Sequence, residues 1–175
     1  MAEAQPSPAN LTFSKASNGN ARRLSLGALI SRAAAHITRF SAPEAFSASA
    51  QDGLIVDIRS QDARKLHGVV PGSVHIPRTV LEWRIALDSP WRNVHLDGLD
   101  QRLILICDHG YSSILAASNL VQLGFYQAGD VIGGFEAWKD LGLPVEPCRP
   151  GVGPTDMLPG TGPPDLPTTM PATRR

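Results

Sequence analysis

One cysteine stands at a position suited to covalent chemistry. Cys107 directly follows the short apolar run Leu103–Ile106, which lacks the polar alternation of a half-exposed strand. Such a run is typical of a strand buried on both faces of a parallel sheet. From Ser112 the apolar residues recur at helical spacing, and Gly124 supplies a C-terminal stop. The pattern predicts a strand, then Cys107, a loop over Asp108–Ser113 and a helix.

This placement would activate the thiol. The first turn of a helix has unpaired backbone N–H groups and carries the positive end of the helix dipole. Both stabilise a thiolate, which is the nucleophilic form of cysteine, and the same N–H groups can hold an anion beside the sulfur. Gly110 gives the loop the freedom to curl around Cys107. The alternative is an inert, buried cysteine that acts as a small hydrophobe.

Further strands and helices are predicted on both sides of this segment. Apolar runs predict strands at Leu54–Ile58, Val74–Ile76 and Asp130–Ile132, and a short edge strand at Ile37–Phe40. Capping patterns and helical spacing predict helices at Ser41–Ser49, Ser60–Leu66, Val80–Leu87 and Phe135–Leu141, with capping boxes at Ser41–Glu44 and Thr79–Glu82. The alternation of strands and helices predicts a three-layer α/β domain with a mostly parallel sheet.

Charged residues close one of these strands. Asp57 and Arg59 end the apolar run Leu54–Ile58. Ligands of open parallel sheets gather at the carboxyl ends of the strands, and Cys107 also ends a strand, so the three side chains are expected at one rim. The alternative for Asp57 and Arg59 is a helix cap and a surface ion pair.

Several segments resemble conserved blocks of the rhodanese-like sulfurtransferase family. ICDHGYSSILAASNL (106–120) and DVIGGFEAWKDLGLPV (130–145) resemble the active-site half of such a domain. GLIVDIRS (53–60) and HGVVPGSVHIP (67–77) resemble its earlier blocks, and all four follow the family's order. The resemblance covers residues 35–146. It implies a five-stranded sheet flanked by helices, and a Cys107 that carries sulfur as a persulfide.

The loop departs from the family's pattern at one position. The family loop usually reads C-x-x-G-x-R-[ST], and Ser112 stands where the arginine is expected. This departure predicts weak use of thiosulfate, which is a dianion. A cysteine phosphatase would need an arginine one position later, where Ser113 stands, so phosphatase chemistry is disfavoured.

Two arginines outside the loop are predicted substrate-binding residues. The family commonly pairs the arginine at position 59 with an acid where this chain has Arg64, so Arg59 needs another partner, such as Asp57 or Asp62. Arg84 belongs to a Leu-Glu-Trp-Arg segment that some bacterial rhodanese-like domains share, and it could replace the missing loop cation. The alternative for Arg84 is a solvated helix arginine.

The loop itself is predicted to form the rim of the site. Its backbone amides would stabilise an anionic sulfur. A carboxylate at Asp108 opposes a neighbouring thiolate if it points inward, and a protonated His109 would offset that effect. The predicted substrate-binding residues of the loop are Asp108, His109, Gly110, Tyr111, Ser112 and Ser113.

The composition limits what else the chain is expected to bind. Among 175 residues, 16 Lys and Arg balance 16 Asp and Glu, so no global field would attract nucleic acid or a membrane. The histidines lie in unrelated segments without metal-ligand spacing, and neither a metal nor a cofactor is expected. Cys107 and Cys148 make no disulfide framework, and a working thiol fits a reducing cytoplasm. Cys148 is interpreted as a bystander, the alternative being a resolving thiol.

The ends of the chain differ from its middle. Residues 1–34 are predicted to be a disordered basic leader, loosely similar to a transit peptide, in which Arg22–His36 could form a short helix. Residues 35–146 are predicted to form the rhodanese-like domain. Residues 147–175 are predicted to be a disordered, Pro-rich tail.

The hypothesis that follows is a single-domain sulfurtransferase. Cys107 would attack a small sulfane donor, thiosulfate or a persulfide, and pass the sulfur to a thiol acceptor that is a small molecule or a protein. The alternative is a non-catalytic binding or scaffold module with the same fold, which the Ser112 departure favours and the retained Cys107 opposes.

Overall fold

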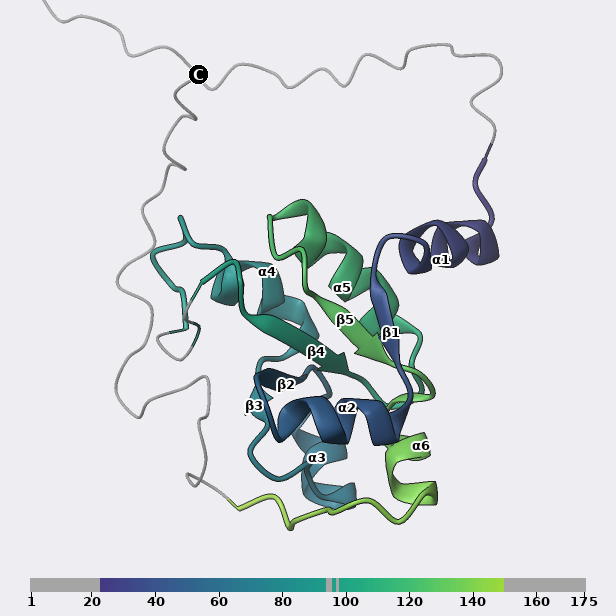
Figure 1. The fold of residues 1–175 in the computed structure, drawn as a ribbon, viewed down its shortest axis with the longest axis vertical. Helices are drawn as coiled ribbons and strands as arrows, with labels where there is room; N and C mark the ends of the chain where they lie inside the picture. Colours follow the sequence, from purple (N-terminus) through teal and green to yellow (C-terminus); the bar gives the residue numbers. More distant parts are fainter. Residues whose placement is uncertain (1–22, 94–95, 97, 150–175) are drawn as a thin grey trace, which may run out of the picture.

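Five parallel strands form one sheet in the order β1-β5-β4-β2-β3 (Figure 1). The computed structural model describes residues 23–93, 96 and 98–149. The strands are β1 Thr38–Phe40, β2 Gly53–Asp57, β3 Val74–His75, β4 Arg102–Ile106 and β5 Gly129–Val131. The helices are α1 Leu26–Ala34, α2 Ala42–Ser49, α3 Gln61–His67, the 3-10 helix η1 Arg78–Val80, α4 Leu81–Ile85, α5 Ser112–Gln122 and α6 Gly134–Asp140. The α/β fold with a five-stranded sheet is confirmed.

The central strand β4 is buried on both faces, which explains its unbroken apolar sequence. Leu103 and Leu105 enter one core, which also contains residues of α4 and α5. Ile104 and Ile106 enter a second core on the opposite face, with residues of α2 and α6. Because successive side chains of a strand point to opposite faces, every residue of the run meets an apolar layer.

The register of β4 brings three polar positions to one end of the sheet. Ile106 lies opposite Asp57 of β2, and Leu105 lies opposite Asp130 of β5. Cys107 follows Ile106 directly. The carboxyl ends of β2, β4 and β5 therefore place Asp57, Cys107 and Asp130 on neighbouring strands, where ligands of parallel sheets are usually found.

The two predicted capping boxes have different outcomes. The box at Ser41–Glu44 is present and begins α2. The box at Thr79–Glu82 is wrong, because neither η1 nor α4 begins with a side-chain cap. Instead, the carboxylate of Glu82 accepts hydrogen bonds from Arg78 at 2.9 Å and from Asn119 of α5 at 2.7 Å. A tertiary contact to α5 has replaced the local cap.

Part of the predicted disordered leader is a helix. Helix α1 begins after Ser25, whose side chain accepts the N–H of Ala28 at 3.2 Å, and it lies against α5 with Ala33 buried (Figure 1). The short helix predicted within Arg22–His36 is confirmed, and the prediction of disorder is wrong for residues 26–34. Residues 1–22 of the predicted leader lie outside the described residues. The predicted tail also lies outside them from residue 150 onward. No helix in the described ranges is long and apolar enough to cross a membrane.

The packing of α1 on α5 makes truncation a test of the domain boundary. Deleting residues 1–34 removes a helix that covers part of α5, so apolar surface of α5 becomes exposed to water. We expect the melting temperature to fall by about 4 °C or more, which corresponds to about 1 kcal/mol. Deleting residues 1–22 is the matched control, since that chain keeps α1. Equal melting temperatures for the two truncated chains would show that α1 contributes nothing to stability.

Candidate active site

The sulfur of Cys107 lies at the start of α5, inside a curled loop. The backbone N–H of Gly110 donates to Sγ at 3.1 Å, and the hydroxyl of Ser113 lies 3.2 Å from Sγ. Helix α5 has no side-chain cap at its own N-cap residue, Tyr111. Gly110 precedes this N-cap residue, so its N–H is a loop donor that points at the sulfur, and the sulfur lies near the positive end of the helix dipole.

These contacts favour the ionised form of Cys107. Burial is the largest single influence on its pKa and opposes ionisation, since Cys107 is only 5% exposed. Hydrogen bonds from the hydroxyls of Ser112 and Ser113 and from the backbone N–H groups of Ser113 and Gly110 act in the other direction. Together they hold the pKa of Cys107 below that of an ordinary cysteine. A lowered pKa raises the thiolate fraction at neutral pH.

The first turn of α6 donates backbone hydrogen bonds to the Cys107 loop. The N–H of Phe135 donates to the carbonyl of Cys107 at 2.8 Å, and that of Glu136 donates to the carbonyl of Asp108 at 3.0 Å. Gly134, at φ +63°, makes this approach possible. A Cβ on Gly134 would overlap the carbonyl oxygen of Cys107 and lie 2.7 Å from the nitrogen of Gly110. A glycine is therefore required at position 134 by the closeness of two backbones.

The loop side chains divide into an inner and an outer set. Ser113 is fully buried beside the sulfur, and Gly110 is also buried. Tyr111 is 68% exposed, and Ser112 is exposed as well. His109 is exposed too, with Nε2 3.4 Å from the carboxylate of Glu136, while Asp108 is half-buried.

Arg59 lies inside the domain. Its Nε and Nη2 donate to the carboxylate of Asp57 at 2.9 and 2.7 Å, and Nη2 also donates to the carbonyl of Gly68 at 2.9 Å. Its guanidinium stacks on the ring of Phe135, 3.5 Å from the centroid. Arg64 also donates to Asp57, at 3.2 Å. Asp57 is thus the acidic partner that Arg59 was expected to need. Because the side chain of Arg59 has no exposed surface, a positioning role is favoured over direct contact with substrate.

Arg84 lies half-buried on α4, which packs beside α5. Its backbone carbonyl accepts the N–H of Asn93 at 2.8 Å. Trp83, its neighbour, was expected in the core or in a lid and is 49% exposed. The role of Arg84 as a replacement cation stays a prediction.

Asp130 is a site residue that the sequence reasoning missed. Ser113 donates to Asp130 Oδ2 at 3.3 Å, so one hydroxyl contacts both the carboxylate and the sulfur. Asp130 has no exposed surface, and Arg39 of β1 binds its two oxygens at 2.8 and 3.2 Å. An available signal was the charge itself, because an acid within an apolar core strand requires a buried partner.

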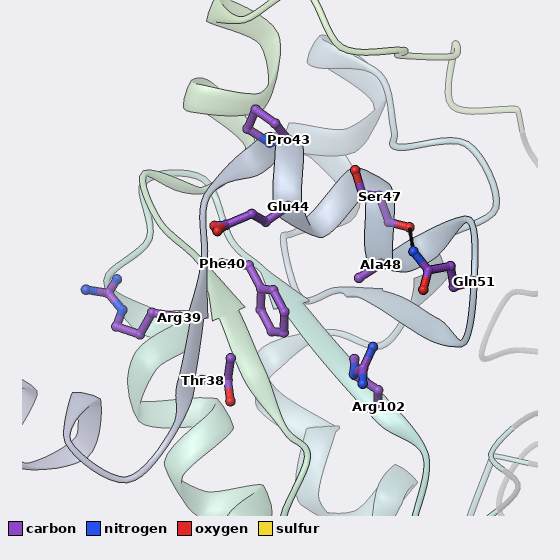
Figure 2. Close-up of a pocket in the computed structure, with 9 residues that line it drawn as sticks. All are labelled: Thr38, Arg39, Phe40, Pro43, Glu44, Ser47, Ala48, Gln51 and Arg102. Carbon is purple, nitrogen blue, oxygen red and sulfur yellow. Dashed lines mark hydrogen bonds between the residues drawn. The ribbon is translucent and has the colours of Figure 1, made fainter.

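A hollow separate from the Cys107 site lies between the edge strand β1, the helix α2 and the start of β4 (Figure 2). Its volume is about 450 Å³, and Cys107 does not line it. Arg39 is among the residues that line the hollow, and Figure 2 shows its guanidinium on the opposite side of β1 from the ring of Phe40. Arg39 therefore belongs to the face on which Asp130 and Ser113 lie. Among the described residues, no cluster of three His, Cys, Asp or Glu could hold a metal ion.

The chain belongs to the rhodanese-like domain family, whose model matches residues 42–141. It is 49% identical over 47 residues to the thiosulfate sulfurtransferase GlpE of Vibrio cholerae, which covers 27% of this chain and 44% of that protein. It is 35% identical over 88 residues to the GlpE of Pseudomonas paraeruginosa, which covers 50% of this chain and 70% of that one. The match to the Vibrio protein thus spans less than half of its length.

Solved structures share the fold. A protein of unknown function from Rhodopseudomonas palustris, described as a possible tyrosine phosphatase, superposes with a TM-score of 0.66 at 30% identity, covering 70% of this chain and 94% of that one. The polysulfide-sulfur transferase homodimer of Wolinella succinogenes superposes with a TM-score of 0.56 at 24% identity, covering 68% and 85%. At that identity the second likeness shows the fold alone.

The contact between Gly134 and the loop can be tested with a matched pair of glycines. Gly134 and Gly142 both have positive φ, +63° and +67°, but a Cβ on Gly142 meets nothing within 4 Å. Gly142→Ala should therefore cost only the backbone strain, about 1–2 kcal/mol. Gly134→Ala should lower the free energy of unfolding by about 1–3 kcal/mol more than Gly142→Ala does, because α6 must move away from the loop.

The measurement is urea unfolding of both variants, together with the rate of Cys107 alkylation by iodoacetamide. Only Gly134→Ala should change that rate, because only Gly134 touches the loop. Equal losses of stability and equal alkylation rates would contradict the close approach.

Proposed function

We propose that the protein is a sulfurtransferase that carries sulfane sulfur as a persulfide on Cys107. The observation that carries this proposal is the buried sulfur at the start of α5, which accepts the N–H of Gly110 and touches the Ser113 hydroxyl. The family membership and the relatives named thiosulfate sulfurtransferase support the same class of reaction. A working thiol of this kind suits a reducing compartment such as the cytoplasm.

The reaction is a transfer of one sulfur atom in two steps. The thiolate of Cys107 attacks the outer sulfur of a sulfane donor, a new S–S bond forms, and the donor's own S–S bond breaks. With thiosulfate the leaving group is sulfite, which departs with the electron pair. An acceptor thiol, on a small molecule or a protein, then attacks the outer sulfur of the Cys107 persulfide, and Cys107 leaves as the thiolate.

The loop supplies neutral hydrogen-bond donors to this chemistry. Backbone N–H groups and hydroxyls, fixed before the reaction, can stabilise the negative charge of the thiolate and of the terminal sulfur. The family's arginine would add a cation and a forked donor suited to an oxyanion, and Ser112 offers an exposed hydroxyl instead. This difference favours a persulfide donor with less charge than thiosulfate.

Phosphatase chemistry receives less support from the same site. Ser113 stands where a cysteine phosphatase needs an arginine, and its hydroxyl is turned inward to Cys107 and Asp130. It therefore supplies no cation to a phosphate group.

A persulfide on Cys107 can be measured directly. After incubation with thiosulfate or a small-molecule persulfide, the intact mass should rise by one sulfur atom, and dithiothreitol should remove the gain. Cys107→Ser should abolish the gain without unfolding the protein, because a hydroxyl fills similar space and is a far poorer nucleophile at neutral pH. Cys148→Ser is the matched control and should keep it. No gain with either donor in the wild-type chain would favour the scaffold alternative.

Steady-state kinetics can test the missing loop arginine. Charge-assisted hydrogen bonds exceed neutral ones by about 1 kcal/mol, so the wild-type protein should show a high KM for thiosulfate. Ser112→Arg should lower that KM by a factor of about five. If Arg84 supplies the cation, Arg84→Ala should raise the thiosulfate KM and Ser112→Arg should partly restore it. Unchanged kinetics in both single variants and the double variant would contradict the anion-binding role of both positions.

A further inference from the structure

A chain of polar contacts leads from the surface of β1 to the sulfur. Arg39, one third exposed, binds both oxygens of the buried Asp130 carboxylate, at 2.8 and 3.2 Å. Asp130 Oδ2 accepts the hydroxyl of Ser113 at 3.3 Å, and that hydroxyl lies 3.2 Å from Cys107 Sγ. Asp130 and Ser113 have no exposed surface. These two groups therefore satisfy each other's hydrogen bonds within the protein.

The hydroxyl of Ser113 has one proton for two acceptors. When Cys107 is a thiol, its S–H can donate to the hydroxyl oxygen while the hydroxyl proton goes to Asp130. When Cys107 is a thiolate, the best use of that proton is a bond to the sulfur, and Asp130 must give it up. The thiol proton itself leaves to water. The carboxylate and the thiolate therefore compete for one hydrogen bond.

We propose that Asp130 is a positioning residue that sets the ionisation of Cys107 by competing for the hydroxyl proton of Ser113, and that Arg39 sets the strength of this competition. The proposal deepens the sulfurtransferase function proposed above, because the same proton would support the thiolate and the persulfide. Its physical basis is that hydrogen bonds to a charged acceptor are about twice as strong as those to a neutral one.

Arg39 makes the exchange reversible. A buried carboxylate without any hydrogen-bond donor strongly destabilises the folded protein. Without Arg39, Asp130 would therefore keep the proton of Ser113. With Arg39 bound to both oxygens, Asp130 keeps two charge-assisted hydrogen bonds when Ser113 turns to the sulfur. Weakening Arg39 should therefore make Asp130 hold the Ser113 proton more firmly and raise the pKa of Cys107.

Other charged groups on the elements around Cys107 are common to every variant below. Several are paired in the structure: His109 with Glu136, Asp57 with Arg59 and Arg64, and Arg78 with Glu82. Asp108 of the loop, Arg84 of α4 and Lys139 of α6 belong to the same elements. Since none of them is altered, their effect cancels when variants are compared.

The test is the pH dependence of Cys107 alkylation by iodoacetamide, measured by intact mass. All proteins carry Cys148→Ser, so that one thiol reacts, and circular dichroism monitors their folding. This reaction needs no sulfur donor. The proposal can therefore fail while persulfide formation succeeds, and the reverse.

Two substitutions should move the alkylation midpoint in opposite directions. Asp130→Asn, which is isosteric but a weaker acceptor, should lower the midpoint by about half a pH unit to one unit, a three- to tenfold change in thiolate at a fixed acidic pH. Arg39→Gln should raise the midpoint by a similar amount. Arg39→Lys keeps the positive charge, so its midpoint should lie close to that of the protein with Arg39. Arg39 is partly exposed, so its variants keep the test decisive even if Asp130→Asn does not fold.

Double variants separate the shared proton from a simple effect of charge. In a Ser113→Ala background there is no proton to share, so neither Asp130→Asn nor Arg39→Gln should move the midpoint appreciably. A charge acting through space would give the same shifts with and without Ser113. Full shifts in the Ser113→Ala background, or an unchanged midpoint in both single variants, would overturn the proposal.

Discussion

The hydrogen bond from the N–H of Gly110 to the sulfur of Cys107 is the constraint around which the site is built. It requires the central strand β4 to end one residue before the cysteine and α5 to begin a short loop later. It also requires the loop to curl so tightly that another segment of backbone must bind the carbonyl groups of Cys107 and Asp108. That segment is the first turn of α6, which donates to both carbonyls. Gly134, the first residue of α6, is thus as necessary to the position of the sulfur as the loop itself.

The strands beside β4 place a buried carboxylate on each side of this loop. Asp57 ends β2 and is bound by Arg59 and Arg64, while Asp130 lies in β5 and is bound by Arg39. Burying a carboxylate is costly unless a cation and further hydrogen bonds accompany it. Both carboxylates meet this condition, on the strands to either side of β4 and Cys107. Three arginines thus bind two carboxylates at this end of the sheet, so these charges are paired within the protein.

Local sequence signals were enough for the elements whose determinants are close in the chain. The strand, the cysteine, the loop and α5 follow one another directly, and the cap at Ser41–Glu44 spans a single turn. Predictions from local sequence were wrong or incomplete where contacts between distant segments decide the structure. Glu82 bonds to Asn119 instead of capping its own helix, and Asp130 joins Arg39 across 91 residues of sequence. The basic composition around α1 resembled a leader, and nothing in it revealed that the helix packs on α5.

The pairing of these charges within the protein affects which anions the site can stabilise. Arg39 and Arg59, on strands that flank the loop, are each bonded to a buried carboxylate. The hydrogen bonds to Cys107 Sγ come from backbone N–H groups and serine hydroxyls, all of which are neutral. Neutral donors fixed in a low-dielectric site stabilise a small, localised charge well, because they need no reorganisation. They add less to the binding of a dianion, whose desolvation requires a cation for compensation. Under the proposed function, we therefore expect a loop with serine in place of arginine to suit the single negative charge of a thiolate or persulfide better than the double charge of thiosulfate.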